Sequence, residues 1–223
     1  MSSSHVGRRN ALKTFVGVAL GSVGAVAATD CGGSSGAAAA PSGTTAGTAY
    51  DRAIATEGVG RAAFQNPHLS NVGFCFYQAD QWLNAMENAY HLNPADVRLV
   101  IVNYASANYL TYNDEIWQTY KIGEVQRITD PKTGAPAVRN VYADDVRRLQ
   151  QRHVVFFACS QALMNHASDA VASGRAPGET AEQVADRIRH NLVEGVFLVP
   201  AGVGELSRVQ LSGHPIIYIP KTL

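Results

Sequence analysis

A cysteine at the end of an apolar run is the residue whose position best suits chemistry in this chain. Cys159 follows the run His153–Ala158 (HVVFFA) and precedes an amphipathic segment that begins at Ser160. If the run is a strand and the segment a helix, the sulfur lies at a helix N-terminus, where unpaired N–H groups and the helix dipole favour a thiolate. A thiolate is a nucleophile. The alternative is a small, inert residue that closes the top of the core.

Further candidate binding residues follow the other apolar runs. In an open α/β sheet, ligands bind beyond the carboxyl ends of the strands, so the segments directly after each run are the ones to consider. These segments are Tyr77–Gln78, Asn103–Asn108, Cys159–Gln161 and Pro200–Gly204. We expect the pocket around Cys159 to be formed by Asn103, Tyr104, Ser106, Ser160, Gly202 and Val203.

A second cysteine, Cys75, lies inside the apolar run Asn71–Tyr77 (NVGFCFY). Its mid-strand position favours core packing. If the first and third strands were neighbours, Cys75 could approach Cys159 and act as a resolving thiol or disulfide partner. With Cys31 the chain has three cysteines, and this odd number excludes a complete disulfide framework.

The remaining motifs predict neither a metal nor a cofactor. The chain has no Cys-x-x-Cys, no His-Glu-x-x-His and no phosphate loop. His166 lies seven residues beyond Cys159, about 10 Å along a helix and too far to act as its base. Asp186 and His190 are typical of a solvated helix face. Four aromatic residues either line a cleft near the second strand or make packing or subunit contacts: Tyr104, Tyr109, Tyr112 and Trp117.

The elements that would position these residues alternate between short apolar runs and amphipathic stretches. This pattern predicts an α/β fold with one doubly wound, mostly parallel five-stranded sheet of the flavodoxin-like kind. The expected strands are Asn71–Tyr77, Val97–Tyr104, His153–Ala158, Val196–Val199 and Pro215–Ile219. The expected helices are Asp80–Leu92, Asn113–Lys121, Ala143–Arg152, Ser160–Ala172, Pro177–Asn191 and Gly202–Leu211, with a polar loop over Glu124–Asn140.

The length of the chain limits the number of domains, and its charge argues against a nucleic-acid-binding protein. The chain has 223 residues, enough for one good-sized domain or at most two small ones. Its 18 Lys and Arg residues balance its 18 Asp and Glu residues. No basic face is available to neutralise phosphates, so we expect no nucleic-acid partner.

The first segment of the chain predicts export. Arg8 and Arg9 precede an uncharged run from Thr14 to Ala28, which ends in small residues suitable for signal-peptidase cleavage. We expect residues 1–28 to be a twin-arginine-type signal peptide and the protein to be periplasmic, with no stable membrane span after processing. A retained N-terminal anchor is the alternative.

Two further segments complete the expected organisation. Residues 29–49 are rich in Gly, Ser, Ala and Thr and predict a flexible linker. Asp30 immediately before Cys31 disfavours lipidation of that cysteine. Residues 50–223 form the expected single domain.

Two segments of this domain resemble the DsrE/DsrF-like family of small α/β sulfur-handling proteins. They are His153–Leu163 (HVVFFACSQAL) and Val199–Ile219 (VPAGVGELSRVQLSGHPIIYI), and Asn113–Trp117 (NDEIW) adds to the likeness. The resemblance covers roughly the domain from Asn71 onward. It implies that Cys159 accepts a sulfane sulfur as a persulfide and passes it to a partner, and that the protein is an oligomer. Ser160, in place of a common Gly, and the Pro177–Asn191 helix depart from the family pattern.

Three hypotheses follow for the function. The first is an exported sulfur-handling protein in which Cys159 carries a persulfide or mixed disulfide. The resemblance implies that this protein is a homo-oligomer and that its partner is a protein that donates or accepts sulfur. The second is a non-enzymatic oligomeric binding or assembly module with an inert Cys159 and contacts made by the Tyr109–Trp117 aromatic residues. The third is peroxide or disulfide chemistry between Cys75 and Cys159.

Overall fold

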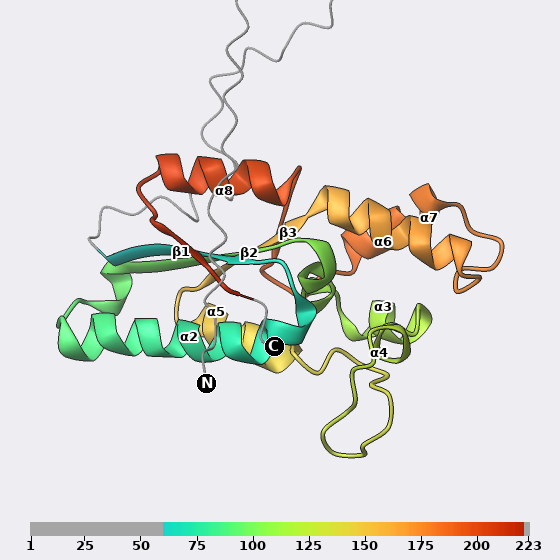
Figure 1. Cartoon of the computed structure of the whole chain (residues 1–223), viewed down its shortest axis with the longest axis horizontal. Coiled ribbons are helices and arrows are strands. Elements are labelled where there is room, and N and C mark those ends of the chain that lie inside the picture. The colour runs from blue at the N-terminus through green and yellow to red at the C-terminus, as the bar shows by residue number, and fades with distance from the viewer. Residues whose placement is uncertain (1–59, 221–223) are drawn as a thin grey trace, which may run out of the picture. The chain divides into compact units, whose positions relative to one another are not determined.

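The computed structural model describes residues 60–220, which form a five-stranded parallel sheet flanked by helices (Figure 1). The spatial order of the strands is β4-β3-β2-β1-β5, and every neighbouring pair is parallel. This confirms the predicted α/β class with a doubly wound sheet. The strands are β1 (Gly60–Asn66), β2 (Val97–Asn103), β3 (Val155–Cys159), β4 (Phe197–Val199) and β5 (Ile216–Tyr218).

The centre of the sheet is its longest part. β1 and β2 pair over seven residues, from Gly60 with Val97 to Asn66 with Asn103. β2 (VRLVIVN) is almost wholly buried, as a strand covered on both faces must be. The two edge strands, β4 and β5, have only three residues each.

The first predicted strand was wrong. Asn71–Tyr77 contains the start of helix α2 (Val72–Asn84), and the first strand is Gly60–Asn66 (GRAAFQN) instead. The buried residues of α2 recur at helical spacing, while its phenylalanine-rich start also fits a buried strand, an ambiguity that periodicity alone does not resolve. β1 is poor in β-branched residues; its place between β2 and β5 makes it a strand.

Helices cover the two faces of the sheet unequally. In Figure 1, α2 and α5 (Ala143–Gln151) lie along one face and α8 (Gly202–Leu211) crosses the other. The face under α8 has its own small core, which includes Val100, Phe157 and Leu206. The α2 helix continues as a π-helical turn, η2 (Ala85–Ala89), so the predicted helix Asp80–Leu92 begins too late and is interrupted.

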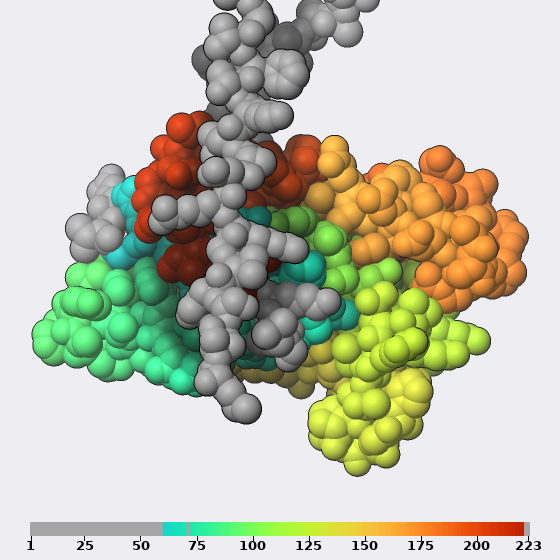
Figure 2. All heavy atoms as spheres, in the orientation of Figure 1, coloured from blue at the N-terminus to red at the C-terminus, as the bar shows by residue number. Residues whose placement is uncertain are grey.

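Most of the remaining helices lie beyond the carboxyl ends of the strands, whereas the short η3 directly precedes β2. Helices α6 (Ser160–Ala172) and α7 (Ala181–His190) pack against each other, and the predicted capping box between Thr180 and Gln183 is present at the start of α7. The other short elements are η1 (Leu69–Asn71), η3 (Pro94–Asp96), η4 (Ala105–Thr111), α3 (Asp114–Thr119) and α4 (Ile122–Val125). The predicted loop within Glu124–Asn140 closes through a bridge between Thr129 and Pro136 and projects as a lobe (yellow-green to yellow in Figure 2).

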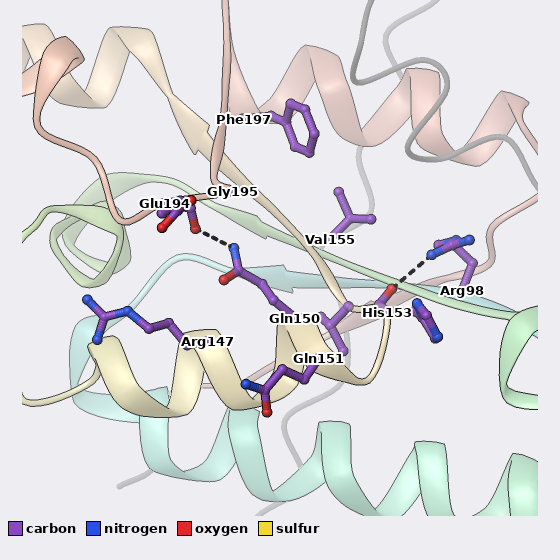
Figure 3. Close-up of a pocket in the computed structure, with 10 residues that line it drawn as sticks. Arg98, Arg147, Gln150, Gln151, His153, Val155, Glu194, Gly195 and Phe197 are labelled. Carbon is purple, nitrogen blue, oxygen red and sulfur yellow. Dashed lines mark hydrogen bonds between the residues drawn. The ribbon is translucent and has the colours of Figure 1, made fainter.

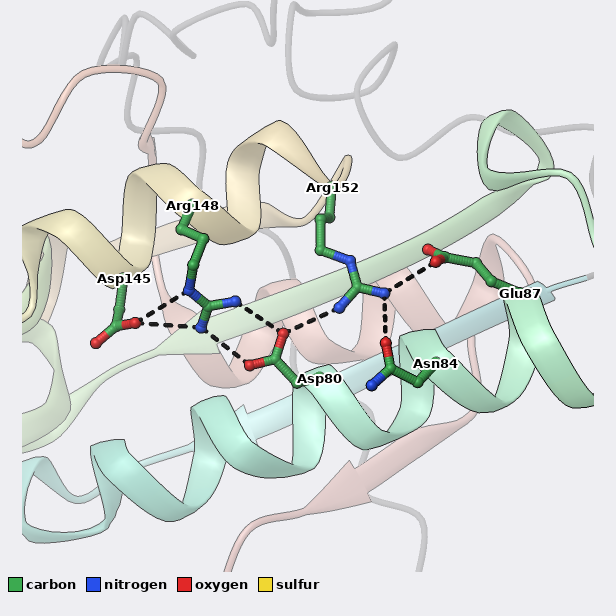
Figure 4. Close-up of polar contacts among 6 residues, drawn as sticks. All are labelled: Asp80, Asn84, Glu87, Asp145, Arg148 and Arg152. Atoms are coloured by element: carbon green, nitrogen blue, oxygen red, sulfur yellow. Dashed lines mark hydrogen bonds and ion pairs between the residues drawn. The ribbon is translucent and has the colours of Figure 1, made fainter.

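A polar network joins α2 to α5 (Figure 4). The Asp80 carboxylate accepts two hydrogen bonds from Arg148, at 2.8 and 2.9 Å, and one from Arg152 at 3.0 Å. Arg152 also donates to Glu87 and Asn84. Burial opposes the charge on Asp80, but the two guanidinium groups outweigh it and hold the pKa of this carboxyl below its usual value.

Within residues 60–220, no helix combines the length and the apolar character needed to cross a bilayer. The predicted signal peptide, the linker and Cys31 lie outside the described residues.

Candidate functional site

Cys159 lies where β3 ends and α6 begins, as the sequence predicts. It is the N-cap residue of α6, and its Sγ accepts a hydrogen bond from the backbone N–H of Ala162 at 3.4 Å. A second N–H, that of Gly202 in the first turn of α8, donates to the same sulfur at 3.2 Å. Only 5% of the residue's surface is exposed. The sulfur is therefore held between two main-chain donors from separate helices.

The topology explains why two helix N-termini meet at this sulfur. β3 and β4 are neighbours, with Cys159 in register with Val199, so the chain leaves both strands at one point of the sheet edge. From there α6 extends away from the sheet, whereas α8 turns back across its face (Figure 1). The N-termini of both helices thus direct a main-chain N–H group at the same sulfur.

Glycine is required at position 202 by close packing. A Cβ there would lie 2.9 Å from the Tyr104 Cβ and 3.4 Å from the Cys159 Cβ. The absence of a side chain lets the α8 backbone approach the sulfur closely enough to donate its N–H. Cys159, Tyr104 and Gly202 thus lie together, as the sequence analysis expected.

Asn108 holds the backbone of Cys159 from the other side. Its Oδ1 accepts the N–H of Cys159 at 2.8 Å, and its Nδ2 donates to the Cys159 carbonyl at 3.1 Å. The Asn108 side chain is fully buried within η4, the segment that follows β2. Asn108 belongs to the segment expected to follow the second strand, but nothing in the local sequence distinguishes it from Asn103, the other asparagine there.

A chain of hydrogen bonds continues from Asn108 to His166. Asn108 Nδ2 donates to the Tyr112 hydroxyl at 3.0 Å, and that hydroxyl lies 2.8 Å from His166 Nδ1. The imidazole ring stacks on Tyr109, with ring centroids 3.7 Å apart. Burial lowers the pKa of His166 to about 4, against the opposing effect of its hydrogen bond to the Ala105 backbone. His166 is a neutral, buried residue near neutral pH.

Four other predicted pocket residues make no hydrogen bond to the Cys159 sulfur. Asn103 is fully buried and accepts a 2.9 Å hydrogen bond from Asn66 on β1, so it ties strands together. Ser106 accepts from Leu69 N–H at 3.1 Å and thereby fixes η1. Ser160 is half-buried at the start of α6, and Val203 is 64% exposed on α8.

Cys75 is a core residue, but on a helix rather than a strand. It is fully buried in α2, and burial raises the pKa of its thiol to about 12. Both Cys75 and Cys159 are free. β2 lies between β1 and β3, so the neighbouring first and third strands required for a Cys75–Cys159 pair are not present.

The aromatic residues after β2 are packing residues. Tyr109, Tyr112 and Trp117 are at most 5% exposed, and the Trp117 indole N–H donates to the Tyr109 carbonyl at 2.9 Å. They therefore offer no surface for subunit contacts. Tyr77 and Gln78, expected after the first strand, lie within α2 because that strand was misplaced.

No group of three or more His, Cys, Asp or Glu residues within 60–220 is arranged to hold a metal ion. Asp186 and His190 are both largely exposed and 3.7 Å apart, as expected for a solvated helix face.

No protein-family model matches the chain, and none of the curated proteins matches it. Among solved structures, a protein of unknown function from Methanobacterium thermoautotrophicum is similar, with 22% sequence identity and a TM-score of 0.41. The match covers 72% of this chain and 99% of that protein.

Proposed function

We propose that this protein is a sulfur carrier in which Cys159 holds a persulfide. The observation that carries the proposal is the position of its Sγ, which accepts N–H donors from the first turns of both α6 and α8. These donors favour the anionic sulfur that sulfur transfer requires. The likeness of His153–Leu163 and Val199–Ile219 to the DsrE/DsrF-like family supports the same chemistry. Export to the periplasm, a homo-oligomeric state and a partner that donates or accepts sulfur belong to this proposal.

The loading step uses an inorganic polysulfide as donor. The Cys159 thiolate attacks a terminal sulfur of the polysulfide dianion, a Cys–S–S⁻ bond forms, and a polysulfide shorter by one sulfur leaves with both remaining negative charges. In the unloading step an acceptor thiolate attacks the outer sulfur, takes it as its own persulfide, and Cys159 returns as thiolate. Neither step needs a further oxidant or reductant.

The burial of Cys159 favours a slender molecule, such as a linear polysulfide, as the sulfur donor. With only 5% of the residue exposed, Cys159 leaves little room for a bulky reactant. A linear polysulfide can present one terminal sulfur to it, whereas a thiol on a folded protein surface is bulkier. Asn108 fixes the Cys159 backbone on both its N–H and its carbonyl, so the sulfur stays aligned with its two donors.

The test is intact-mass analysis of the protein after brief exposure to polysulfide. We expect the native chain to gain the mass of one sulfur atom and Cys159→Ser to gain none. Cys75→Ser is the matched control, because it removes the other described thiol, and it should still load. Equal loading of the Cys159→Ser variant and the native protein would refute the proposal.

A second candidate is a non-enzymatic assembly module with an inert Cys159. It is favoured by apolar side chains exposed at the β5 edge of the sheet, among them Phe74, Ile217 and Tyr218. They border a groove of about 440 Å³ between α2 and β5, whose occupant would be a second copy of the chain. Sedimentation equilibrium tests it: a stable dimer that Ile217→Lys dissociates, together with no sulfur adduct, would favour this function over sulfur transfer.

A further inference from the structure

A second site lies at the opposite end of β3 from Cys159. A groove of about 550 Å³ opens at the amino ends of β3 and β4. The groove is shallow and widely open to solvent, with room for a small molecule that stays partly exposed. Figure 3 shows that it is bordered by the last turns of α5, by the turn before β3 and by the turn before β4.

The charged groups of the groove favour an anion. Two guanidinium groups, those of Arg98 and Arg147, line it, against one carboxylate, Glu194. Arg98 donates to the His153 carbonyl at 3.3 Å, and within residues 60–220 no carboxylate forms an ion pair with it. Its Nε is buried and without a hydrogen-bond partner. Because this atom has no exposed surface, a ligand in the groove would bind the outer N–H groups of the guanidinium rather than Nε.

The second cation is available to a ligand as well. Arg147 pairs with Asp144 at 3.0 Å, but both side chains are more than half exposed. An exposed pair of this kind is weak and exchanges readily for a better acceptor. In Figure 3, Arg147 and Arg98 lie at opposite ends of the groove, with Gln150 and His153 between them.

Gln150, which lies between the two arginines, is held in place by a hydrogen bond to the backbone. Gln150 Nε2 donates to the Glu194 carbonyl at 2.9 Å across the turn before β4. Gly195 makes room for it, because a Cβ there would lie 2.8 Å from that Nε2, and Gly195 also has a φ of 77°, which favours glycine. The amide of Gln150 is thus held in place before any ligand arrives.

Apolar side chains of the sheet complete the groove. Val155 of β3 and Phe197 of β4 line it, and the Phe197 ring packs edge-on against Phe157, with centroids 6.2 Å apart. We propose that this groove binds a small organic anion, a carboxylate or a phosphate monoester. Its oxygens would be bound by Arg98 and its apolar part would contact Phe197 and Val155. The site does not depend on sulfur chemistry at Cys159.

The experiment is titration calorimetry of the full chain with three probes: phenyl phosphate, benzoate and the uncharged benzyl alcohol. We expect saturable binding of one or both anions, weakened by added salt, and no binding of benzyl alcohol. The tighter of the two anions identifies the headgroup. Arg98→Gln keeps a donor for the His153 carbonyl and should weaken binding about tenfold or more, since a charge-assisted hydrogen bond is lost.

Two more variants make the result decisive. Glu194→Gln removes the carboxylate of the groove and should tighten binding severalfold. Arg187→Gln, which removes a surface arginine paired with Glu179 on another part of the domain, should leave binding unchanged. If Arg98→Gln fails to fold, Glu194→Gln still tests the site, because tighter anion binding in that variant requires the ligand to lie in this groove. The assignment is overturned if neither anion binds, if benzyl alcohol binds as well, or if the groove variants behave like Arg187→Gln.

Discussion

At the scale of single residues, the position of the Cys159 sulfur depends on one backbone N–H and one side-chain amide. Gly202 donates its N–H, and Asn108 fixes the backbone that carries the thiol. Neither a glycine nor an asparagine suggests, from its residue type alone, a role at a reactive thiol. They matter because of where they lie, and we expect their substitution to change the reactivity of the Cys159 thiol even though the thiol itself is unchanged.

Gly202→Ala tests this directly. The added Cβ would meet Tyr104 at 2.9 Å, so α8 must shift and its N–H must move from the sulfur. We expect a loss of about 1–3 kcal/mol in the free energy of unfolding and slower alkylation of Cys159 by iodoacetamide at fixed pH. Gly204→Ala is the matched control in the same helical turn, because its Cβ would meet only Ala201 at 3.9 Å. Similar alkylation rates in the two variants would contradict this account.

His166 predicts a pH dependence of stability. Its folded-state pKa of about 4 lies below the ordinary value of 6.5, so the unfolded chain takes up the proton first. The stabilisation by neutral His166 is complete above pH 6.5 and is lost as pH falls toward 4, up to about 3 kcal/mol. Urea unfolding at pH 7.0, 5.5 and 4.5 measures this slope. It should become shallower in His166→Gln, where a remainder comes from His214, whose pKa burial also lowers. It should persist in full in His190→Gln, where the ring is 74% exposed. An unchanged slope in His166→Gln would show that other groups cause it.

At the scale of elements, the α2–α5 network fixes how two helices lie against one face of the sheet. Asp80 is its centre, since it accepts from both Arg148 and Arg152. Its lowered pKa means that its contribution is present at neutral pH and is lost as pH falls through the acidic range, when the carboxylate is protonated.

Asp80→Asn should therefore destabilise the fold at pH 7 by about 1–3 kcal/mol, because two partly buried guanidinium groups lose a charged acceptor. Asp144→Asn removes an exposed carboxylate from α5, one whose side chain is 90% exposed, and should change stability by less than about 0.5 kcal/mol. Chemical denaturation at pH 7 compares the two. Equal effects would mean that the network contributes no more than a surface pair.

Sequence patterns anticipated most of these elements. The apolar runs located β2 to β5, and α5, α6 and α8 begin where predicted because each shows helical spacing next to a strand. The first strand was missed because β1 has few strand-forming residues and acquires its buried character from β2 and β5 on either side. The α2 segment was misread because Phe74, Phe76 and Tyr77 suit a strand as well as a helix.

The site could be predicted only in part, because some of its residues adjoin elements with a clear sequence pattern and others do not. Cys159, Tyr104 and Gly202 directly follow or begin elements with clear patterns, so topology alone brings them together. The clamp by Asn108 depends on how η4 folds back onto the end of β3, which no local pattern encodes. The groove at the amino ends of β3 and β4 could not be predicted in this way, because ligand sites of open α/β sheets are expected at the carboxyl ends of the strands.

At the scale of the whole molecule, the described domain has candidate sites at both ends of one strand. β3 runs from the groove at Val155 to the sulfur at Cys159, about 13 Å away for an extended strand of this length. The sheet that holds both sites is completed by β5, whose ladder with β1 pairs Ala63 with Ile216 and Gln65 with Tyr218.

Deletion of residues 214–223 should accordingly cost far more than the loss of a three-residue strand. It would expose the edge of β1, whose Ala63 and Phe64 are now at most 2% exposed. We expect the truncated chain to lose its cooperative thermal transition by circular dichroism and to scatter light at micromolar concentration. A truncated protein that melts like the native one would show that β5 is dispensable.

The pairing of the last strand with the first also constrains synthesis. Ribosomes deliver the N-terminal part of a domain long before its end. Here β1 gains its second neighbour only after residues 216–218 have left the exit tunnel, since the β1–β5 ladder joins residues about 150 positions apart. Until then β1 presents an open hydrogen-bonding edge. We expect nascent chains that stall before β5 has emerged to pair with one another through this edge.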